Sequence, residues 1–191
     1  ALNNAVVALD SIKLSAAASH RCFVAEVMGR KCGYLSLMSG LATGAEKVYL
    51  NEEGITLAGL AADSERMVES FRSGRSLYLV IRNERASVNY TTDVLAHIFA
   101  EEGKGLYDVR EAILGHQQQG GSPTAFDRIM ATKLIAYSLE LLAGALKRGE
   151  PTASYVGLMG GKVSDQPLDR MNDDLDRAVE ETLGIIKEFL G

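Results

Sequence analysis

The sequence predicts an α/β fold of three α/β/α layers, in which a mostly parallel β-sheet lies between helices as one part of a larger fold. Helical and strand patterns alternate with few interruptions along the 191 residues. The strongest predicted strand, residues 77–81, is a continuous apolar run, which is typical of strands covered on both faces. We find no internal repeat or long linker, so we expect one region spanning residues 1–191.

Apolar periodicity and turn residues place the elements in order. Leu2, Val6 and Leu9 recur at helical spacing near the start of the chain. The predicted helices are residues 2–18, 33–44, 57–72, 91–102, 123–148 and 172–189. The predicted strands are residues 22–27, 48–50, 77–81, 109–114 and 155–159. Ser122 is the expected N-cap of the fifth helix, with Pro123 as its first residue.

Composition and charge exclude several classes of protein. An apolar fraction of 47% and a charged fraction of 24% are typical of a globular chain with a real core. The net charge of −5 argues against general nucleic-acid binding, and no Lys/Arg run is present to attract an anionic membrane. No apolar stretch approaches the roughly 20 residues that a membrane-spanning helix needs. We therefore expect no nucleic-acid or membrane partner.

Cysteines and histidines indicate no disulfide framework and no metal site. Cys22 and Cys32 lie in apolar surroundings and are expected to be buried free thiols in a reducing cytoplasm. The histidines His20, His97 and His116 are too far apart to suggest zinc ligands.

The first residues carry no positive charge, which argues against a signal peptide. A helical pattern already runs at the first residue, so we expect a chain cut from a longer one.

Polar groups follow the ends of predicted strands, where parallel sheets bind their ligands. The first such loop is Met28-Gly29-Arg30, in which glycine permits close backbone approach and arginine can pair with phosphate or sugar oxygens. The second, residues 82–85, places Glu84 where it can accept hydrogen bonds from sugar hydroxyls. Structural interpretations stay open for both: a tight turn with a surface arginine, and a salt-bridged strand exit.

The third loop, residues 115–121, is flanked by glycines and leads into a helix N-terminus that favours an anion. His116 and Gln119 are donors suited to a sugar phosphate, although a hydrogen-bonded structural histidine is the alternative. The loop lacks the lysine and Ser/Thr of a Walker A nucleotide loop. The glycines of residues 157–161 are wrongly spaced for a dinucleotide-binding fingerprint.

Together these motifs resemble the ATP-dependent 6-phosphofructokinase family. The matching stretches are FVAEVMGRKCGYL at 23–35, LGHQQQGGSP at 114–123 and FDR at 126–128. Arg21, Glu84 and Arg110 fall at the expected distances from them. The likeness runs from the first residue to about residue 161 and continues more faintly beyond.

The resemblance implies a sugar phosphate held by residues from all three loops. It implies that Glu84 contacts sugar hydroxyls and that His116 binds phosphate. It also implies a homo-oligomer in which Arg21 and Arg110 reach across a subunit interface to the phosphate of a neighbour's ligand. The expected site residues are Arg21, Met28, Gly29, Arg30, Glu84, Arg110, His116 and Gln119.

Two departures from the family pattern bear on the role of this region. Gln119 stands where catalytic halves of the family usually have arginine. Residues 82–85 and the glutamine-rich loop resemble the C-terminal half of long, duplicated phosphofructokinases, which binds fructose 2,6-bisphosphate as a regulator in animals and fungi. Arg30, in contrast, is the version found in catalytic halves.

The family's nucleotide loop and catalytic base belong to segments that we expect upstream of residue 1, so we assign no catalytic residue here. The resemblance implies a full-length glycolytic enzyme that transfers phosphate from ATP, with Mg²⁺, to the 1-hydroxyl of fructose 6-phosphate. This chain would be its sugar-phosphate-binding portion, inactive alone and without bound ATP or metal. The alternatives are a non-catalytic regulatory half that binds a sugar bisphosphate, and a pyrophosphate-dependent relative.

Overall fold

A computed structural model describes residues 1–16, 19–149 and 153–190 of the chain. The chain divides into two compact units, Ala1–Gly121 and Ser122–Gly191. The first helix, α1, spans Leu2–Ala16, and the last two residues of the helix predicted there, 17 and 18, lie outside the described residues.

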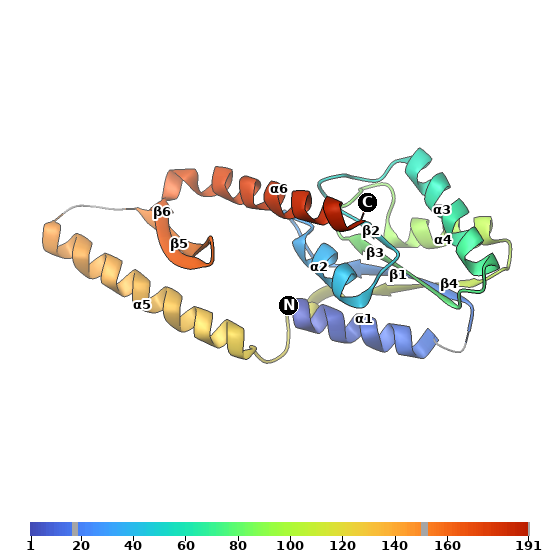
Figure 1. Cartoon of the computed structure of the whole chain (residues 1–191), viewed down its shortest axis with the longest axis horizontal. Helices are drawn as coiled ribbons and strands as arrows, with labels where there is room; N and C mark the ends of the chain where they lie inside the picture. The colour runs from blue at the N-terminus through green and yellow to red at the C-terminus, as the bar shows by residue number, and fades with distance from the viewer. Residues whose placement is uncertain (17–18, 150–152, 191) are drawn as a thin grey trace. The chain divides into compact units, whose positions relative to one another are not determined.

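The first unit is built on a four-stranded parallel sheet in the order β2-β3-β1-β4 (Figure 1). The strands are β1 (Arg21–Val27), β2 (Lys47–Tyr49), β3 (Leu77–Asn83) and β4 (Asp108–Ile113). In the register of the sheet, Arg21 lies opposite both Leu77 and Asp108. The carboxyl ends of β1, β3 and β4 therefore reach the same edge of the sheet, and the predicted mostly parallel sheet is confirmed.

Helices cover both faces of this sheet, which confirms the three-layer α/β/α prediction. Alternate residues of β1 point to opposite faces, as the period of a strand requires. Phe23, Ala25 and Val27 pack with α1 and with partly buried Leu35 of α2 (Tyr34–Thr43). Cys22 and Val24 pack with α3 (Leu57–Arg72) and α4 (Thr92–Gly103).

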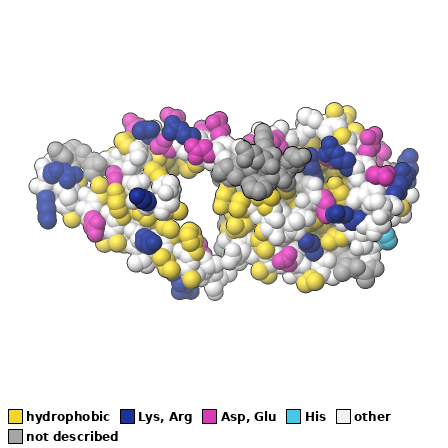
Figure 2. Space-filling model, viewed as in Figure 1, with side chains coloured by type: hydrophobic (Ala, Val, Ile, Leu, Met, Phe, Trp, Pro, Cys, Tyr) yellow, Lys and Arg dark blue, Asp and Glu magenta, His cyan; other side chains and the backbone are white. Residues whose placement is uncertain are grey.

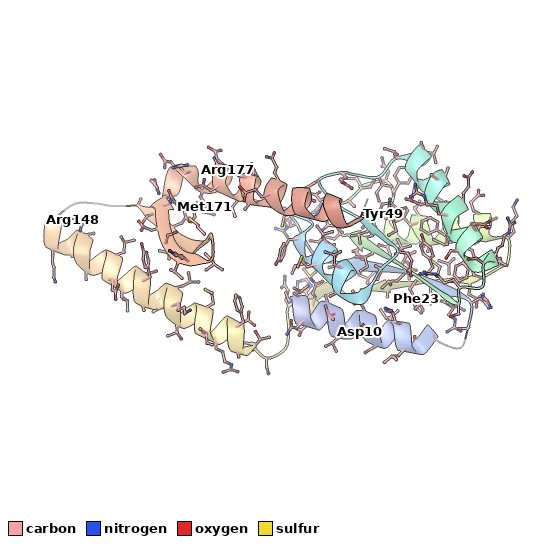
Figure 3. All side chains as sticks on the ribbon, viewed as in Figure 1. Asp10, Phe23, Tyr49, Arg148, Met171 and Arg177 are labelled. Carbon is pink, nitrogen blue, oxygen red and sulfur yellow. The ribbon has the colours of Figure 1, made fainter. Side chains whose placement is uncertain are left out.

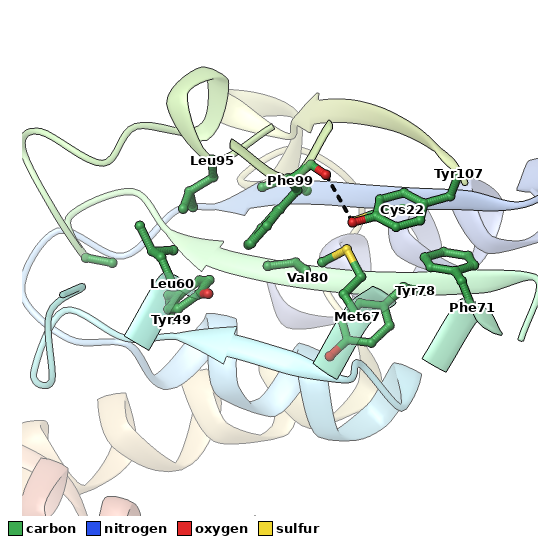
Figure 4. Close-up of a cluster of buried hydrophobic side chains, with 12 residues drawn as sticks. Cys22, Tyr49, Leu60, Met67, Phe71, Tyr78, Val80, Leu95, Phe99 and Tyr107 are labelled. Atoms are coloured by element: carbon green, nitrogen blue, oxygen red, sulfur yellow. Dashed lines mark hydrogen bonds between the residues drawn. The ribbon is translucent and has the colours of Figure 1, made fainter. Parts of the chain in front are cut away.

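An aromatic cluster is buried between the sheet and the helices α3 and α4 (Figure 4). Phe71 and Tyr107 stack with ring centroids 4.3 Å apart, and the Tyr107 hydroxyl donates a hydrogen bond of 3.0 Å to the Phe99 carbonyl. Cys22 lies in this cluster as a free, buried thiol whose pKa is raised by burial, so it stays protonated and unreactive. Cys32 is also free but only half-buried.

The second unit contains a two-stranded antiparallel sheet, not a part of the predicted parallel sheet. It consists of α5 (Ala125–Arg148), the strands β5 (Ser154–Met159) and β6 (Lys162–Pro167), and α6 (Met171–Leu190), with Arg148, Met171 and Arg177 labelled in Figure 3. The strand predicted at 155–159 pairs antiparallel with β6 and does not join the parallel sheet.

A two-glycine turn explains this hairpin. Gly160 and Gly161 both have positive φ values, 54° and 77°, which suit the tight turn between antiparallel strands. β6 itself was not predicted, because its sequence KVSDQP is mostly polar and gives no apolar strand signal. A glycine pair after an apolar run was the available signal for the second strand.

The start of α5 also differs from the prediction. The N-cap is Thr124, not Ser122, and the helix begins at Ala125 beyond Pro123. The Thr124 hydroxyl accepts a hydrogen bond from the Asp127 amide, while the Asp127 carboxylate accepts one of 2.8 Å from the Thr124 amide. This reciprocal capping box satisfies two backbone donors, which a cap at Ser122 would not do.

α5 exposes much of its apolar surface within the described residues (Figure 2). By length and composition alone it is apolar enough to cross a membrane, so the prediction that no stretch reaches that length is wrong for this helix. Lys133 and Glu140 interrupt the apolar run, which is why the sequence pattern did not show it. The exposed apolar side chains are Phe126, Ile129, Ile135, Leu139, Leu142 and Leu146.

Candidate functional site

The loop that leaves β1 is fixed by side chains from three other segments. The Met28 amide donates a 2.9 Å hydrogen bond to Oε1 of Gln118. The Gly29 amide donates to Oε1 of Glu84 at 3.2 Å, and the amide of Gly33 donates to a second glutamate, Glu52, at 2.8 Å. These three hydrogen bonds fix the path of the backbone from Met28 to Gly33.

Glycine at position 29 is required by close packing. A Cβ atom built there would lie 2.5 Å from the Cys32 carbonyl oxygen and would also collide with the Asn83 side chain. Asn83 is fully buried and accepts a 2.9 Å hydrogen bond from the Arg85 amide. The loops after β1 and β3 thus pack directly against each other at the sheet edge.

At the end of β3, Arg82 forms a buried salt bridge, which was the structural alternative for residues 82–85. Its guanidinium is buried and lies 2.8 Å from Oε2 of Glu26 on β1. It also donates to the carbonyl oxygens of Tyr90 at 2.9 Å and Ser87 at 2.6 Å. Burial lowers the pKa of Arg82, while Glu26 opposes that shift by favouring the charged form. Glu84, two residues further on, is left half-exposed.

The loop after β4 begins with a 3₁₀ turn, Gly115–Gln118. Gly115 has a φ of 51°, a left-handed conformation that glycine adopts without strain. His116 and Gln119 are exposed, whereas Gln118 points inward and is 2% exposed. The Asn4 side chain of α1 donates to the Gln118 carbonyl oxygen at 3.3 Å.

These three loops surround one pocket of about 510 Å³, formed entirely by the first unit. The structure brings together six of the eight residues predicted for the site: Met28, Gly29, Arg30, Glu84, His116 and Gln119. The remaining lining residues, which the motif comparison did not single out, are Ala1, Leu35, Arg85 and Gln118. Arg85 and Gln118 both belong to predicted strand-exit loops, but the role of Gln118 depends on its contact with the distant Met28, which the sequence alone does not show.

Arg21 and Arg110, the other two predicted site residues, do not line this pocket. Arg21 is the first residue of β1, at the opposite end from Met28. Arg110 sits within β4, which is the last strand of the sheet, and lies 3.9 Å from Asp108 with both side chains mostly exposed. The buried Nε of Arg21 has no hydrogen-bond partner among the described residues.

Chemically, the pocket combines positive charge with hydrogen-bonding groups of both kinds. Arg30 and Arg85 provide guanidinium donors, and His116 can add an imidazole donor. Glu84 provides a carboxylate acceptor suited to hydroxyl groups. Within the described residues, no group of three or more His, Cys, Asp or Glu side chains could hold a metal ion. Cationic donors and a carboxylate acceptor in one pocket suit a small anion that also carries hydroxyl groups.

Comparisons with known proteins show the family of this chain. Residues 1–142 match the family model described as phosphofructokinase. The chain belongs to the phosphofructokinase family.

Its sequence is 46% identical over 176 residues to the ATP-dependent 6-phosphofructokinase of Dictyostelium discoideum, covering 91% of this chain and 21% of that relative. The muscle-type ATP-dependent 6-phosphofructokinase of Oryctolagus cuniculus is 47% identical over 148 residues, covering 77% of this chain and 19% of the relative. The chain therefore spans about a fifth of the curated phosphofructokinases it matches.

Solved structures show the same phosphofructokinase fold. The structure of phosphofructokinase from Saccharomyces cerevisiae matches with a TM-score of 0.83 and 38% identity, over 88% of this chain and 24% of that one. A pyrophosphate-dependent phosphofructokinase from Marinobacter aquaeolei matches with a TM-score of 0.62 and 18% identity, over 87% of this chain and 44% of that one, a likeness of fold alone.

Proposed function

We propose that this chain is the sugar-phosphate-binding region of an ATP-dependent 6-phosphofructokinase and that its ligand lies in the pocket around Arg30, Glu84 and His116. The observation that carries the proposal is the convergence of three strand-exit loops on one pocket with two arginines and a histidine. Guanidinium groups pair well with a dianionic phosphate, and a carboxylate such as that of Glu84 accepts hydrogen bonds from sugar hydroxyls.

In the full-length protein, the reaction would move the γ-phosphoryl group of ATP to the 1-hydroxyl of fructose 6-phosphate. Phosphoryl transfer needs a metal–nucleotide clamp and a positioned base. This chain spans about a fifth of its curated relatives, and we place the Mg²⁺ and ATP site in other segments of the full-length protein. We accordingly expect the isolated chain to be inactive and the full enzyme to work in glycolysis in the cytoplasm.

We also propose that the phosphate site is completed between subunits of a homo-oligomer. Arg21 and Arg110 do not line the pocket of their own chain, and the ion pair that Arg110 makes with Asp108 in the described part of the chain is long and exposed, so it stabilises the fold little. In this proposal both arginines reach the phosphate of a neighbouring subunit's ligand.

A second candidate function is a regulatory half that binds fructose 2,6-bisphosphate and biases the enzyme's conformation. Gln119 favours it, because this neutral side chain lines the pocket where catalytic halves usually have arginine. Arg30 favours a catalytic half. Titration of the full-length protein with fructose 6-phosphate, fructose 1,6-bisphosphate and fructose 2,6-bisphosphate would separate the two roles, since tight binding of the 2,6-bisphosphate alone supports regulation.

The sharpest test of the pocket is Arg30→Ala with Lys31→Ala as its control. Both residues are exposed cations on the same loop, but only Arg30 lines the pocket. A hydrogen bond to a charged group contributes about 1.5–3 kcal/mol, so Arg30→Ala should weaken sugar-phosphate binding by roughly 10- to 150-fold in calorimetric titration. Equal affinities for the two variants would show that the ligand binds elsewhere.

A further inference from the structure

Gln118 connects two of the loops that line the pocket, the one after β1 and the one after β4. Its side chain is 2% exposed, and Oε1 accepts the Met28 amide hydrogen at 2.9 Å. Its backbone carbonyl accepts a hydrogen bond from Asn4 on α1. The neighbouring Gln117 and Gln119 are exposed, so only Gln118 of the three consecutive glutamines turns inward.

The orientation of the Gln118 amide is fixed by this contact. A backbone N–H needs an acceptor, so the oxygen of the amide must face Met28 and the nitrogen must point elsewhere. That nitrogen, Nε2, is buried and has no hydrogen-bond partner in the described part of the chain. A buried donor without a partner is costly and is uncommon in native proteins, and Gln118 is one of the residues that line the pocket.

We propose that Gln118 is a positioning and specificity-determining residue: its oxygen holds the Met28-Gly29-Arg30 loop, and its Nε2 donates to an oxygen atom of the ligand. The proposal rests on the sugar-phosphate function proposed above and deepens it. One side-chain amide then contacts both the ligand and the loop that carries Arg30.

The packing around Gly29 explains why this contact matters for binding. Gly29 is held by Glu84 on one side and lies against Cys32 and Asn83 on the other, so the loop has little room to adjust. Loss of the bond at Met28 would therefore release the loop at its first residue and shift Arg30. A residue with a merely structural role would change stability but leave the affinity of the folded protein unchanged.

The experiment uses the full-length protein with fructose 6-phosphate as the probe. Gln118→Met keeps the length of the side chain but removes both the acceptor and the donor. Gln118→Glu, studied at a pH where the carboxyl is ionised, keeps an oxygen for Met28 but removes the Nε2 donor. Gln117→Met is the matched control, since Gln117 is exposed and does not line the pocket. Affinity is measured by calorimetry and loop mobility by hydrogen exchange.

Both Gln118 variants should bind at least about tenfold more weakly than wild type, whereas Gln117→Met should bind normally. Exchange at Met28 should accelerate in Gln118→Met but stay near wild type in Gln118→Glu. Wild-type affinity in the Gln118 variants that fold would overturn the role of Gln118 while leaving the proposed function intact. A wild-type protein that binds no fructose 6-phosphate would overturn the proposed function and this inference with it.

Discussion

Replacing Arg82 with methionine should strongly destabilise the protein, although Arg82 follows the same strand as the pocket residues. The side chains of Arg82 and Glu26 are 3% and 21% exposed, so Arg82→Met leaves a largely buried carboxylate that keeps, among the described residues, its hydrogen bond from the Thr92 hydroxyl. Breaking a buried pair costs about 3–5 kcal/mol, and the partial exposure of Glu26 places this case near 3 kcal/mol. The carbonyl oxygens of Ser87 and Tyr90 would also lose their donor.

The control for this change is Arg75→Met. Arg75 pairs with Glu46, but its side chain is 49% exposed, and exposed pairs contribute about 0–1 kcal/mol. Urea unfolding of both variants, with linear extrapolation to water, gives the two free-energy changes directly. If Arg82→Met lost no more stability than Arg75→Met, the buried ion pair would not organise the exit of β3 as described.

Two further predictions concern the alkaline limit of stability and the subunit interface. Burial raises the pKa of Tyr78 and Tyr107 from 10.0 to about 12. The stabilisation from their neutral hydroxyls is therefore complete below pH 10 and is lost as the pH rises towards about 12. A phenolate absorbance titration in which both tyrosines of the folded protein ionise with the ordinary pKa would contradict this prediction. Mixing Arg110→Ala and Glu84→Ala subunits should restore some sugar-phosphate sites in hybrid oligomers, and exchanged hybrids without binding would show that each site is built within one chain.

Much of the first unit follows from its sequence, because buried parallel strands are apolar runs and their exits are marked by polar motifs. The strand at 77–81 and the helix at 57–72 were predicted within a few residues, and the positions of Arg30, Glu84 and His116 after three parallel strands predicted one shared pocket. The direction of the parallel strands thus determines which edge of the sheet carries the site, because ligands bind at the carboxyl ends of the strands.

The features that sequence reasoning missed depend on pairing between residues. β6 is too polar to be recognised without its partner β5, and Thr124 is distinguished from Ser122 only by the return bond from Asp127. In the sequence, Gln118 is one of three consecutive glutamines with nothing to distinguish it, whereas in the structure its side chain is buried and accepts a hydrogen bond from the Met28 amide. The role of Gln118 arises from a tertiary contact, which neither apolar periodicity nor local turn preference encodes.

The most direct test of the central claim is a crystal structure of the full-length protein grown with fructose 6-phosphate. We predict the sugar phosphate in the pocket of this chain, with its phosphate within hydrogen-bond distance of His116 and Arg30 or of a neighbouring subunit's arginine, and with a sugar hydroxyl on the Glu84 carboxylate. A pocket left empty of sugar phosphate while fructose 6-phosphate occupies a site elsewhere in the protein would contradict the claim.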